Sequence, residues 1–325
     1  MYFMRRRKKI RLRIGKIFLL ILFMTALTTG IVSAFKYVGA FLQDKPADGE
    51  SLMYNEDNVK IIANSDDYII ISVDYKEIYK GNLVLVNNKN LYNFEEDENL
   101  VSLYDYKSLT YNVKDKNVLL LKEIIEPLNN MLNDFYNKYN LKTLNVVSGH
   151  RTLEFQQSLY ENEVFEKGEV EAQKWVAKPG GSEHHTGLAL DFSIFYNNGT
   201  SACYNGTGDY AWINDNAYKY GFIVRYDEIK SDITGISYEP WHFRYVGIPH
   251  SYIMTQNGFC LEEYIDHLRQ YEFGKKHLSI EYEGVEYEIY FTKDTQIYVP
   301  KDKEYAISGN NQDGFIITSY GSKHR

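Results

Sequence analysis

The clearest periodic pattern in the chain is a stripe of apolar residues between positions 121 and 135. They recur at steps of three and four residues, which is the spacing of one face of an α-helix, so the segment predicts an amphipathic helix. Pro127 falls inside this pattern. Because proline lacks a backbone N–H and clashes with the preceding turn, we expect the helix to be kinked there or to begin later than the stripe suggests. The stripe consists of Leu121, Ile124, Ile125, Leu128, Met131, Leu132 and Phe135.

Short runs rich in apolar, β-branched and aromatic residues lie on both sides of this helix and predict strands. Before it, a strand-rich region contains such runs at 69–73 and 83–86. After it, predicted strands alternate with predicted helices: the strands are at 144–147, 189–194, 222–226 and 241–246, and the helices at 153–160, 248–256 and 261–271. The chain ends in a predicted antiparallel unit with strands at 277–282, 285–291, 297–299 and 315–319 and turns at Glu283-Gly284 and 309–311.

These patterns divide the chain into five predicted parts, with the last boundary near residues 273–276 and no repeat of a fixed period. The parts are a basic head with an apolar run (1–36), a polar acidic tether (37–58), the strand-rich region (59–116), a central domain (117–273) and a C-terminal β unit (274–325).

The first part has the pattern of a membrane segment. Eight basic residues between positions 5 and 16 precede an uncharged apolar run at 17–35. A helix of this length spans about 28 Å, enough to cross a bilayer core, and the positive flank marks the cytoplasmic side, so everything after Lys36 is expected outside the cytoplasm. Residues 32–34 resemble a signal cleavage site, but the run is longer than a typical signal-peptide core. A single-pass signal anchor is therefore favoured over a cleaved signal.

The net charge of −8 conceals two different parts. The first 36 residues carry nine basic and no acidic residues, so the rest holds 27 basic residues against 44 acidic ones, a net charge of −17. A body with this balance repels a phosphate backbone, which excludes nucleic-acid binding as its main role. With 44% hydrophobic and 25% charged residues, the composition is that of a folded globular protein rather than of a disordered or fibrous one.

Two cysteines, Cys203 and Cys260, occur in the predicted outer part of the chain. Outside the cytoplasm they can form a disulfide, which is worth about 4 kcal/mol for a loop of this length. Two free thiols are an equal alternative, because the sequence does not show that the cysteines meet. Neither cysteine has the spacing of a C-x-x-C or zinc-knuckle motif.

Two segments carry residues that could hold a metal ion. In the first, His184 and Asp191 are seven residues apart, and a glycine between them lets the chain turn into a predicted strand. The second segment contains Glu239 and His242. A catalytic zinc needs three protein ligands, an open position and a base that is not a ligand, so His184, Asp191 and His242 are candidate ligands and Glu239 is the candidate base. His185 is a rival for His184, and spacing alone does not bring the two segments together.

Together with Ser148-Gly149-His150-Arg151-Thr152, these segments resemble the VanY-like zinc D-alanyl-D-alanine carboxypeptidases. The matching motifs are S-x-H-x-x-G-x-A-x-D at 182–191 and E-x-x-H at 239–242, and the resemblance extends over about 117–271. It implies an α+β fold in which a small antiparallel sheet, flanked by helices, carries the zinc site. It further implies that His184, Asp191 and His242 bind Zn²⁺, that Glu239 is the catalytic base and that Arg151 stabilises the transition state. His150 stands where relatives usually carry tyrosine, which leaves one substrate contact in doubt.

The resemblance implies that the protein removes the terminal D-Ala from peptidoglycan stem peptides outside the membrane, with Ser182, Arg151 and His150 binding the substrate. Arg244 is a further candidate for the terminal carboxylate. An L,D-carboxypeptidase, a D,D-dipeptidase and a non-catalytic zinc-stabilised cell-wall binding module are the alternatives. A penicillin-target serine enzyme is not favoured, because S-x-x-K occurs once, at 33–36, and no K-T-G follows it. H-E-x-x-H is absent, which excludes the common helical zinc peptidases.

Overall fold

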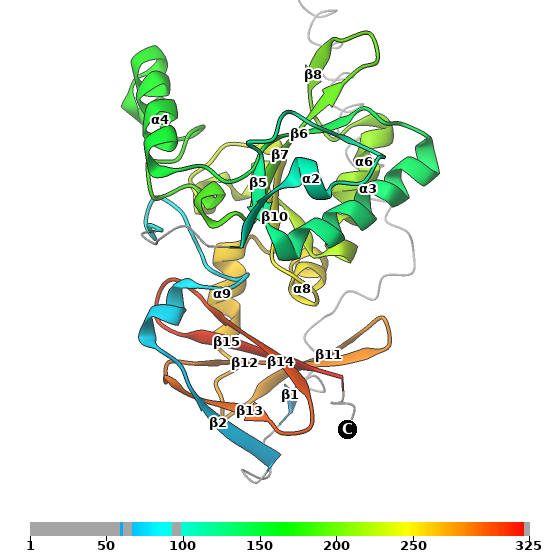
Figure 1. The fold of residues 1–325 in the computed structure, drawn as a ribbon. Coiled ribbons are helices and arrows are strands. Elements are labelled where there is room, and N and C mark those ends of the chain that lie inside the picture. The colour runs from blue at the N-terminus through cyan, green and yellow to red at the C-terminus, as the bar shows by residue number, and fades with distance from the viewer. Residues whose placement is uncertain (1–58, 61–66, 93–98, 322–325) are drawn as a thin grey trace, which may run out of the picture. The chain divides into compact units, whose positions relative to one another are not determined.

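The computed structural model describes residues 59–60, 67–92 and 99–321 (Figure 1). The predicted membrane segment and the tether lie outside these ranges. Within the described ranges, no helix combines the length and the apolar character needed to cross a membrane.

A six-stranded mixed sheet carries the motifs of the central segment. Its pairings are antiparallel, apart from one parallel pairing between β4 and β6. His242 lies opposite Asp191 on the neighbouring strand, and Ser148 lies opposite Asp191 on the other side. The four strands predicted in this segment are confirmed. In spatial order the strands are β4 (Asn112–Val113), β6 (Leu144–Ser148), β7 (Ala189–Phe195), β10 (Glu239–Tyr245) and β9 (Phe222–Tyr226), with β8 (Ser201–Cys203) paired to β7.

The predicted amphipathic helix is α3 (Ile125–Tyr139), which follows one 3₁₀ turn and begins later than the apolar stripe. Pro127 therefore stands in the first turn, where its missing N–H has no partner to lose. The buried side of α3 packs in one hydrophobic core with β6, β7 and β10 (Figure 1). The helix thus covers one face of the site-bearing sheet.

The remaining helices are short, apart from α4 (Leu153–Lys167), which extends beyond its predicted end. Thr152 caps α4, because its hydroxyl accepts a hydrogen bond from the N–H of Phe155 at 3.2 Å. The other α-helices are α2 (Leu103–Tyr106), α5 (Glu169–Ala172), α6 (Ala211–Asn216), α7 (Ser231–Thr234), α8 (His250–Asn257) and α9 (Leu261–Leu268). The 3₁₀ helices are η3 (Tyr75–Tyr79), η4 (Lys122–Ile124), η5 (Glu183–Thr186), η6 (Gly208–Tyr210), η7 (Ala217–Tyr220) and η8 (Glu228–Lys230).

The end of the chain forms a second, fully antiparallel sheet with the order β1-β11-β12-β15-β14. Glu283 and Gly284, both with positive φ, form its predicted two-residue hairpin turn between Tyr282 and Val285. Two strands from the beginning of the described chain pair with strands of this unit. The sequence predicted neither these pairings nor strand β14. The strands are β1 (Val59–Lys60), β2 (Tyr68–Ser72), β11 (His277–Tyr282), β12 (Val285–Thr292), β13 (Gln296–Pro300), β14 (Glu304–Gly309) and β15 (Phe315–Tyr320), with β13 paired to β2; β3 (Leu100–Ser102) pairs with β5 (Leu119–Leu121) separately.

The predicted strand at 83–86 is wrong, for a physical reason. Val84 and Val86 are buried in the core that α3 shares with the central sheet. Leu83 and Leu85 are instead buried in a second core formed by α8, α9, β11 and β12. The continuous apolar run therefore arises from a segment that passes between two cores and directs alternate side chains into each. Its backbone groups bond to side chains and to a loop rather than to a neighbouring strand: the Val84 carbonyl accepts from Arg244 at 2.9 Å, and the N–H of Leu85 donates to the carbonyl of Asn310 at 3.3 Å.

Of the two alternatives for the cysteines, the structure supports free thiols. Cys203 is exposed on β8, and Cys260 is buried at the N-terminus of α9.

Candidate active site

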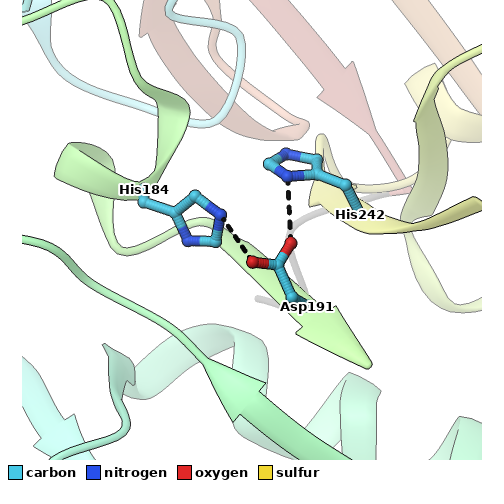
Figure 2. A group of neighbouring side chains, drawn as sticks. All are labelled: His184, Asp191 and His242. Carbon is cyan, nitrogen blue, oxygen red and sulfur yellow. Dashed lines mark ion pairs between the residues drawn. The ribbon is translucent and has the colours of Figure 1, made fainter. Parts of the chain in front are cut away.

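The structure brings the three predicted ligands together (Figure 2). His184 comes from η5, Asp191 from β7 and His242 from β10, and all three are buried. The Nε2 atom of His184 lies 3.2 Å from Oδ2 of Asp191, and Nδ1 of His242 lies 3.1 Å from Oδ1 of Asp191. Among the described residues, this is the group whose ligand atoms are close enough to share one metal ion.

Gly187 makes the turn that delivers Asp191 to this position. It ends η5 with φ of 69°, a backbone conformation that side chains with a Cβ rarely adopt. A Cβ atom at this position would lie 2.6 Å from Cδ2 of Leu100. The positive φ therefore favours glycine, and a Cβ atom would also require the Leu100 side chain to move.

Hydrogen bonds decide which histidine faces the site. The Nδ1 atom of His184 is 2.7 Å from the carbonyl of Gly149, so its Nε2 is directed at Asp191. In contrast, both ring nitrogens of His185 are engaged elsewhere: Nε2 accepts from the N–H of Gly180 at 3.1 Å, and Nδ1 lies 2.6 Å from the carbonyl of Arg151. His185 is thus no rival for the ligand position.

The donor set fits zinc. Nε2 of His184 and Oδ1 of Asp191 are buried polar atoms without a hydrogen-bond partner in the described part of the chain. Burial lowers the pKa of His184 to about 4, so this ring is neutral, as a metal ligand must be. Burial also acts to lower the pKa of His242, but Asp191, Glu183 and Glu239 outweigh it and raise the pKa to about 9. The same excess of negative charge favours a bound dication.

Glu239 begins β10 beside these residues, and its Oε2 lies 3.8 Å from Nδ1 of His242. Burial raises the pKa of its carboxyl to about 7, and neighbouring Asp191 adds to the rise. A carboxyl group with a pKa near neutrality can both take up and release a proton, which is the property that an acid–base catalyst needs.

Arg151 connects the site to its surroundings through three groups. Its Nη2 donates to Oδ2 of Asp191 at 2.6 Å, Nε donates to the hydroxyl of Ser148 at 3.0 Å, and Nη1 donates to Oε1 of Gln156 at 3.4 Å. Burial raises the pKa of the Asp191 carboxyl, but His184, His242 and Arg151 outweigh it and hold the pKa well below its ordinary value.

These groups open into a cavity of about 430 Å³. Ser182 is among its lining residues, but His150 is not, so substrate binding by His150 stays a prediction. Arg244 cannot meet a substrate carboxylate as considered above, because its side chain is fully buried and paired with Glu183. The lining includes Arg151, Gln156, Leu159, Asn162, Glu163, Lys167, Trp175, Ser182, His184, Asp191, Tyr226, Glu239, Trp241 and His242.

Sequence motifs missed several of these lining residues. Three aromatic lining residues occur in ordinary strand or loop patterns: Tyr226, Trp241 and Trp175. The only signals in the sequence that could have identified them are their aromatic character or a position close to a motif. Gln156 had no signal beyond its place five residues after Arg151. It is nevertheless buried, and its amide donates to the carbonyl of Ala177 at 2.8 Å.

Comparisons with known proteins agree with this geometry. The family model described as VanY: D-alanyl-D-alanine carboxypeptidase matches residues 117–248. A D-alanyl-D-alanine carboxypeptidase of Enterococcus faecium is 38% identical over 260 residues, which cover 78% of this chain and 80% of that protein. The solved structure of the vancomycin resistance D,D-dipeptidase VanXYg, in complex with a D-Ala-D-Ala phosphinate analog, is 34% identical with a TM-score of 0.69, covering 78% of this chain and 99% of that one. A mutant of the vancomycin resistance D,D-pentapeptidase VanY, in complex with Zn(II), is also 34% identical, covering 57% of this chain and 98% of that one with a TM-score of 0.47.

Proposed function

The chain belongs to the VanY family of D-alanyl-D-alanine carboxypeptidases, and from this premise we propose how its own residues divide the reaction. The protein is a hydrolase that uses zinc and removes terminal D-Ala from peptidoglycan stem peptides. The observation that carries the assignment of residues is the convergence of His184, Asp191 and His242 beside Glu239 in one cavity.

His184, Asp191 and His242 hold the zinc ion, with one ring nitrogen or carboxylate oxygen from each. A bound zinc supplies Lewis-acid chemistry, since it polarises a carbonyl and lowers the pKa of water. With three protein ligands, a bound zinc would have the ligand count of a catalytic rather than a structural zinc site.

Glu239 moves the proton. Its carboxylate takes a proton from the attacking water and returns it to the amine of the leaving D-Ala. The raised pKa of about 7 suits both steps, because the group binds the proton firmly enough to accept it and loosely enough to give it up. A purely structural zinc site needs no such base, so Glu239 weighs against a non-catalytic binding module.

Arg151 supplies fixed positive charge. It lines the cavity, and an arginine guanidinium offers five N–H donors and a permanent positive charge. We assign it two roles: it holds Asp191 through the 2.6 Å contact, and it stabilises the negative charge that develops on the carbonyl oxygen during attack. Ser182 and Arg151 line the same cavity, and we propose that they bind the substrate there.

The test is product analysis with defined substrates. Purified protein is incubated with stem tri-, tetra- and pentapeptides and with free D-Ala-D-Ala, and products are identified by mass spectrometry. Release of one D-Ala from the pentapeptide, blocked by chelators and insensitive to penicillin, is the expected result. The matched control is a pentapeptide with an amidated terminal carboxylate, which should be cleaved far more slowly. Equal cleavage of both peptides, or cleavage within the stem, would contradict the exopeptidase assignment.

A D,D-dipeptidase activity is the second candidate, because the similar VanXYg structure is named a D,D-dipeptidase. Rapid hydrolysis of free D-Ala-D-Ala in the same experiment would support it. Hydrolysis of a tetrapeptide would instead support the L,D-carboxypeptidase.

For location, we propose an outer catalytic region held by an N-terminal signal anchor. The support is the sequence pattern of eight basic residues before the uncharged run at 17–35, together with a substrate that lies outside the membrane. Protease added to cells without a wall but with an intact membrane should digest residues 40–325. Complete protection would contradict this orientation.

A further inference from the structure

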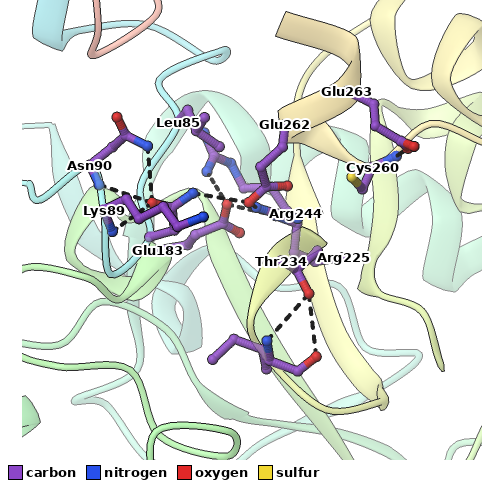
Figure 3. A network of polar contacts seen from close by, with 12 residues as sticks. Leu85, Lys89, Asn90, Glu183, Arg225, Thr234, Arg244, Cys260, Glu262 and Glu263 are labelled. Atoms are coloured by element: carbon purple, nitrogen blue, oxygen red, sulfur yellow. Dashed lines mark hydrogen bonds and ion pairs between the residues drawn. The ribbon is translucent and has the colours of Figure 1, made fainter. Parts of the chain in front are cut away.

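Figure 3 shows a second cluster of charged side chains, which the mechanism above does not use. The cluster adjoins the proposed zinc ligand His242, because Glu183 lies next to it. The side chains of Glu183, Arg225 and Arg244 are completely shielded from solvent, and that of Glu262 is 13% exposed. They come from four different elements: η5, β9, β10 and α9. Burying four charges is costly, so their arrangement calls for an explanation.

Both arginines hold one and the same oxygen of Glu183. Nε of Arg225 donates to Oε1 at 2.8 Å, and Nη1 of Arg244 lies 3.0 Å from Oε1. The second oxygen, Oε2, lies 3.6 Å from Nε2 of His242. Both of these atoms are buried and have no hydrogen-bond partner in the described part of the chain. The free oxygen of the carboxylate therefore faces the free nitrogen of a zinc ligand.

The imidazole of His242 thus stands between two carboxylates. Its Nδ1 is directed at Asp191, on the metal side, and its Nε2 is directed at Glu183. When one nitrogen of an imidazole binds a metal, the other carries the proton, and a carboxylate facing that proton fixes the tautomer and the ring orientation. We propose that Glu183 is a positioning residue, which holds His242 with its proton on Nε2 so that Nδ1 is presented to zinc.

The arginines keep Glu183 charged and in place. The two guanidinium groups place their positive charge on Oε1, at 2.8 Å from Arg225 and 3.0 Å from Arg244. Arg244 is itself fixed, since Nη2 donates to the carbonyls of Asn82 at 3.0 Å and Val84 at 2.9 Å. The other zinc-binding histidine has no such carboxylate, because His184 is oriented by the neutral carbonyl of Gly149.

This proposal rests on the proposed function, in which His242 binds zinc. The test measures the zinc affinity of the full chain, by competition with a chelating dye, for the parent, Glu183→Gln and Glu262→Gln. The first variant keeps the shape of the side chain but removes the charge facing His242, and we expect zinc affinity to fall about 10- to 100-fold. Glu262→Gln removes a charge from the same network where it contacts Arg225 but not His242, and its zinc affinity should stay within about twofold of the parent.

Equal zinc affinity in the parent and Glu183→Gln would overturn the proposal. So would an equal loss in both variants, since that would mean a structural effect of the network. A parent that binds no zinc, or a His242→Ala variant that retains full zinc affinity, would contradict the proposed function instead. The two failures are therefore distinguishable.

A second measurement does not depend on whether Glu183→Gln folds. Nitrogen NMR of the zinc-loaded parent, labelled with ¹⁵N at histidine, reports which ring nitrogen carries a proton. The proposal expects a proton on Nε2 of His242 and none on Nδ1. The reverse assignment would overturn it.

Discussion

Two regions in the described part of the chain bury a histidine against a carboxylate, and we propose a reaction site at one of them. In the central region His184, Asp191 and His242 meet beside a cavity. In the C-terminal β unit Nδ1 of His277 lies 2.6 Å from Oε1 of Glu288, and both side chains are almost completely shielded from solvent. Residue type and burial therefore do not distinguish the two.

The difference is whether the carboxylate still has a free oxygen. In the β unit, Oε1 of Glu288 also accepts from the hydroxyl of Tyr68 at 3.3 Å, and Oε2 accepts from Lys303 at 3.5 Å. Both oxygens of Glu288 are satisfied by the protein itself. In contrast, Oδ1 of Asp191 has no hydrogen-bond partner among the described residues and faces a second histidine. A site is marked by unsatisfied buried atoms that converge, because these are the atoms that a ligand completes.

The largest effect expected from this comparison is the loss of one zinc ligand. His242→Ala should abolish both zinc binding and turnover, because a catalytic zinc needs three protein ligands and this variant keeps two. The negative charge that remains around the site does not replace the missing ligand. Chelation of the parent should have the same effect on turnover. Zinc content is measured by elemental analysis and turnover by release of D-Ala.

The matched control is His277→Ala in the β unit. It should leave zinc content and turnover unchanged and lower the free energy of unfolding by about 1–3 kcal/mol, because Glu288 loses a buried hydrogen-bond partner. Loss of zinc in His277→Ala, or retention of zinc in His242→Ala, would break the distinction between the two regions.

The next largest effect is expected when the catalytic base is removed and the zinc ligands are left in place. Glu239→Gln should keep zinc but lower kcat by about 10²- to 10⁴-fold, because the amide cannot take a proton from water. Its control, Glu288→Gln, changes another buried glutamate outside the site and should lower stability but not kcat. Near-normal turnover in Glu239→Gln would remove Glu239 from the mechanism.

The candidate ligands and the candidate base could be selected from the sequence because they lie in two short motifs with fixed spacing, and the structure brings these residues together. The register of β7 and β10, which sets His242 opposite Asp191, turns that linear pattern into a site. The ion pairs of Glu183 could not be predicted, because its partners Arg225 and Arg244 lie in strands β9 and β10, far from Glu183 in sequence. A charge inside a buried strand signals only that some partner exists, and the fold decides which one.

The same limit explains the errors in the fold. The hairpin at 283–284 is specified locally by its turn residues and was predicted. The pairing of β2 with β13 joins residues more than 200 positions apart, and no local pattern specifies such a partner. The segment at 83–86 is a continuous apolar run because its side chains enter two cores in turn, and such a run does not show whether the backbone pairs with a strand.

A smaller effect is expected from pH. The catalytic glutamate must be ionised to accept a proton, and burial raises the pKa of Glu239 to about 7. The value of kcat/KM should therefore fall as the pH is lowered through this pKa, by about tenfold per pH unit below it. A bound zinc attracts the ionised form and shifts the limb of the profile toward lower pH. A profile without an acidic limb between about pH 4.5 and 7 would contradict the role of Glu239 as base.

The smallest effect should come from the edge of the β-unit cluster. Lys303 lies 3.5 Å from Oε2 of Glu288, and its side chain is 22% exposed, so solvent screens this ion pair. Lys303→Met should lower the free energy of unfolding by less than about 1 kcal/mol, as measured by urea denaturation, and leave zinc affinity unchanged. His277 and Tyr68 continue to donate to Oε1 of Glu288, and water can reach the position that Lys303 leaves. A loss above about 3 kcal/mol would show that Lys303 is the main partner of a buried charge. The β unit would then resemble the central site, in which removal of one group leaves a carboxylate uncompensated.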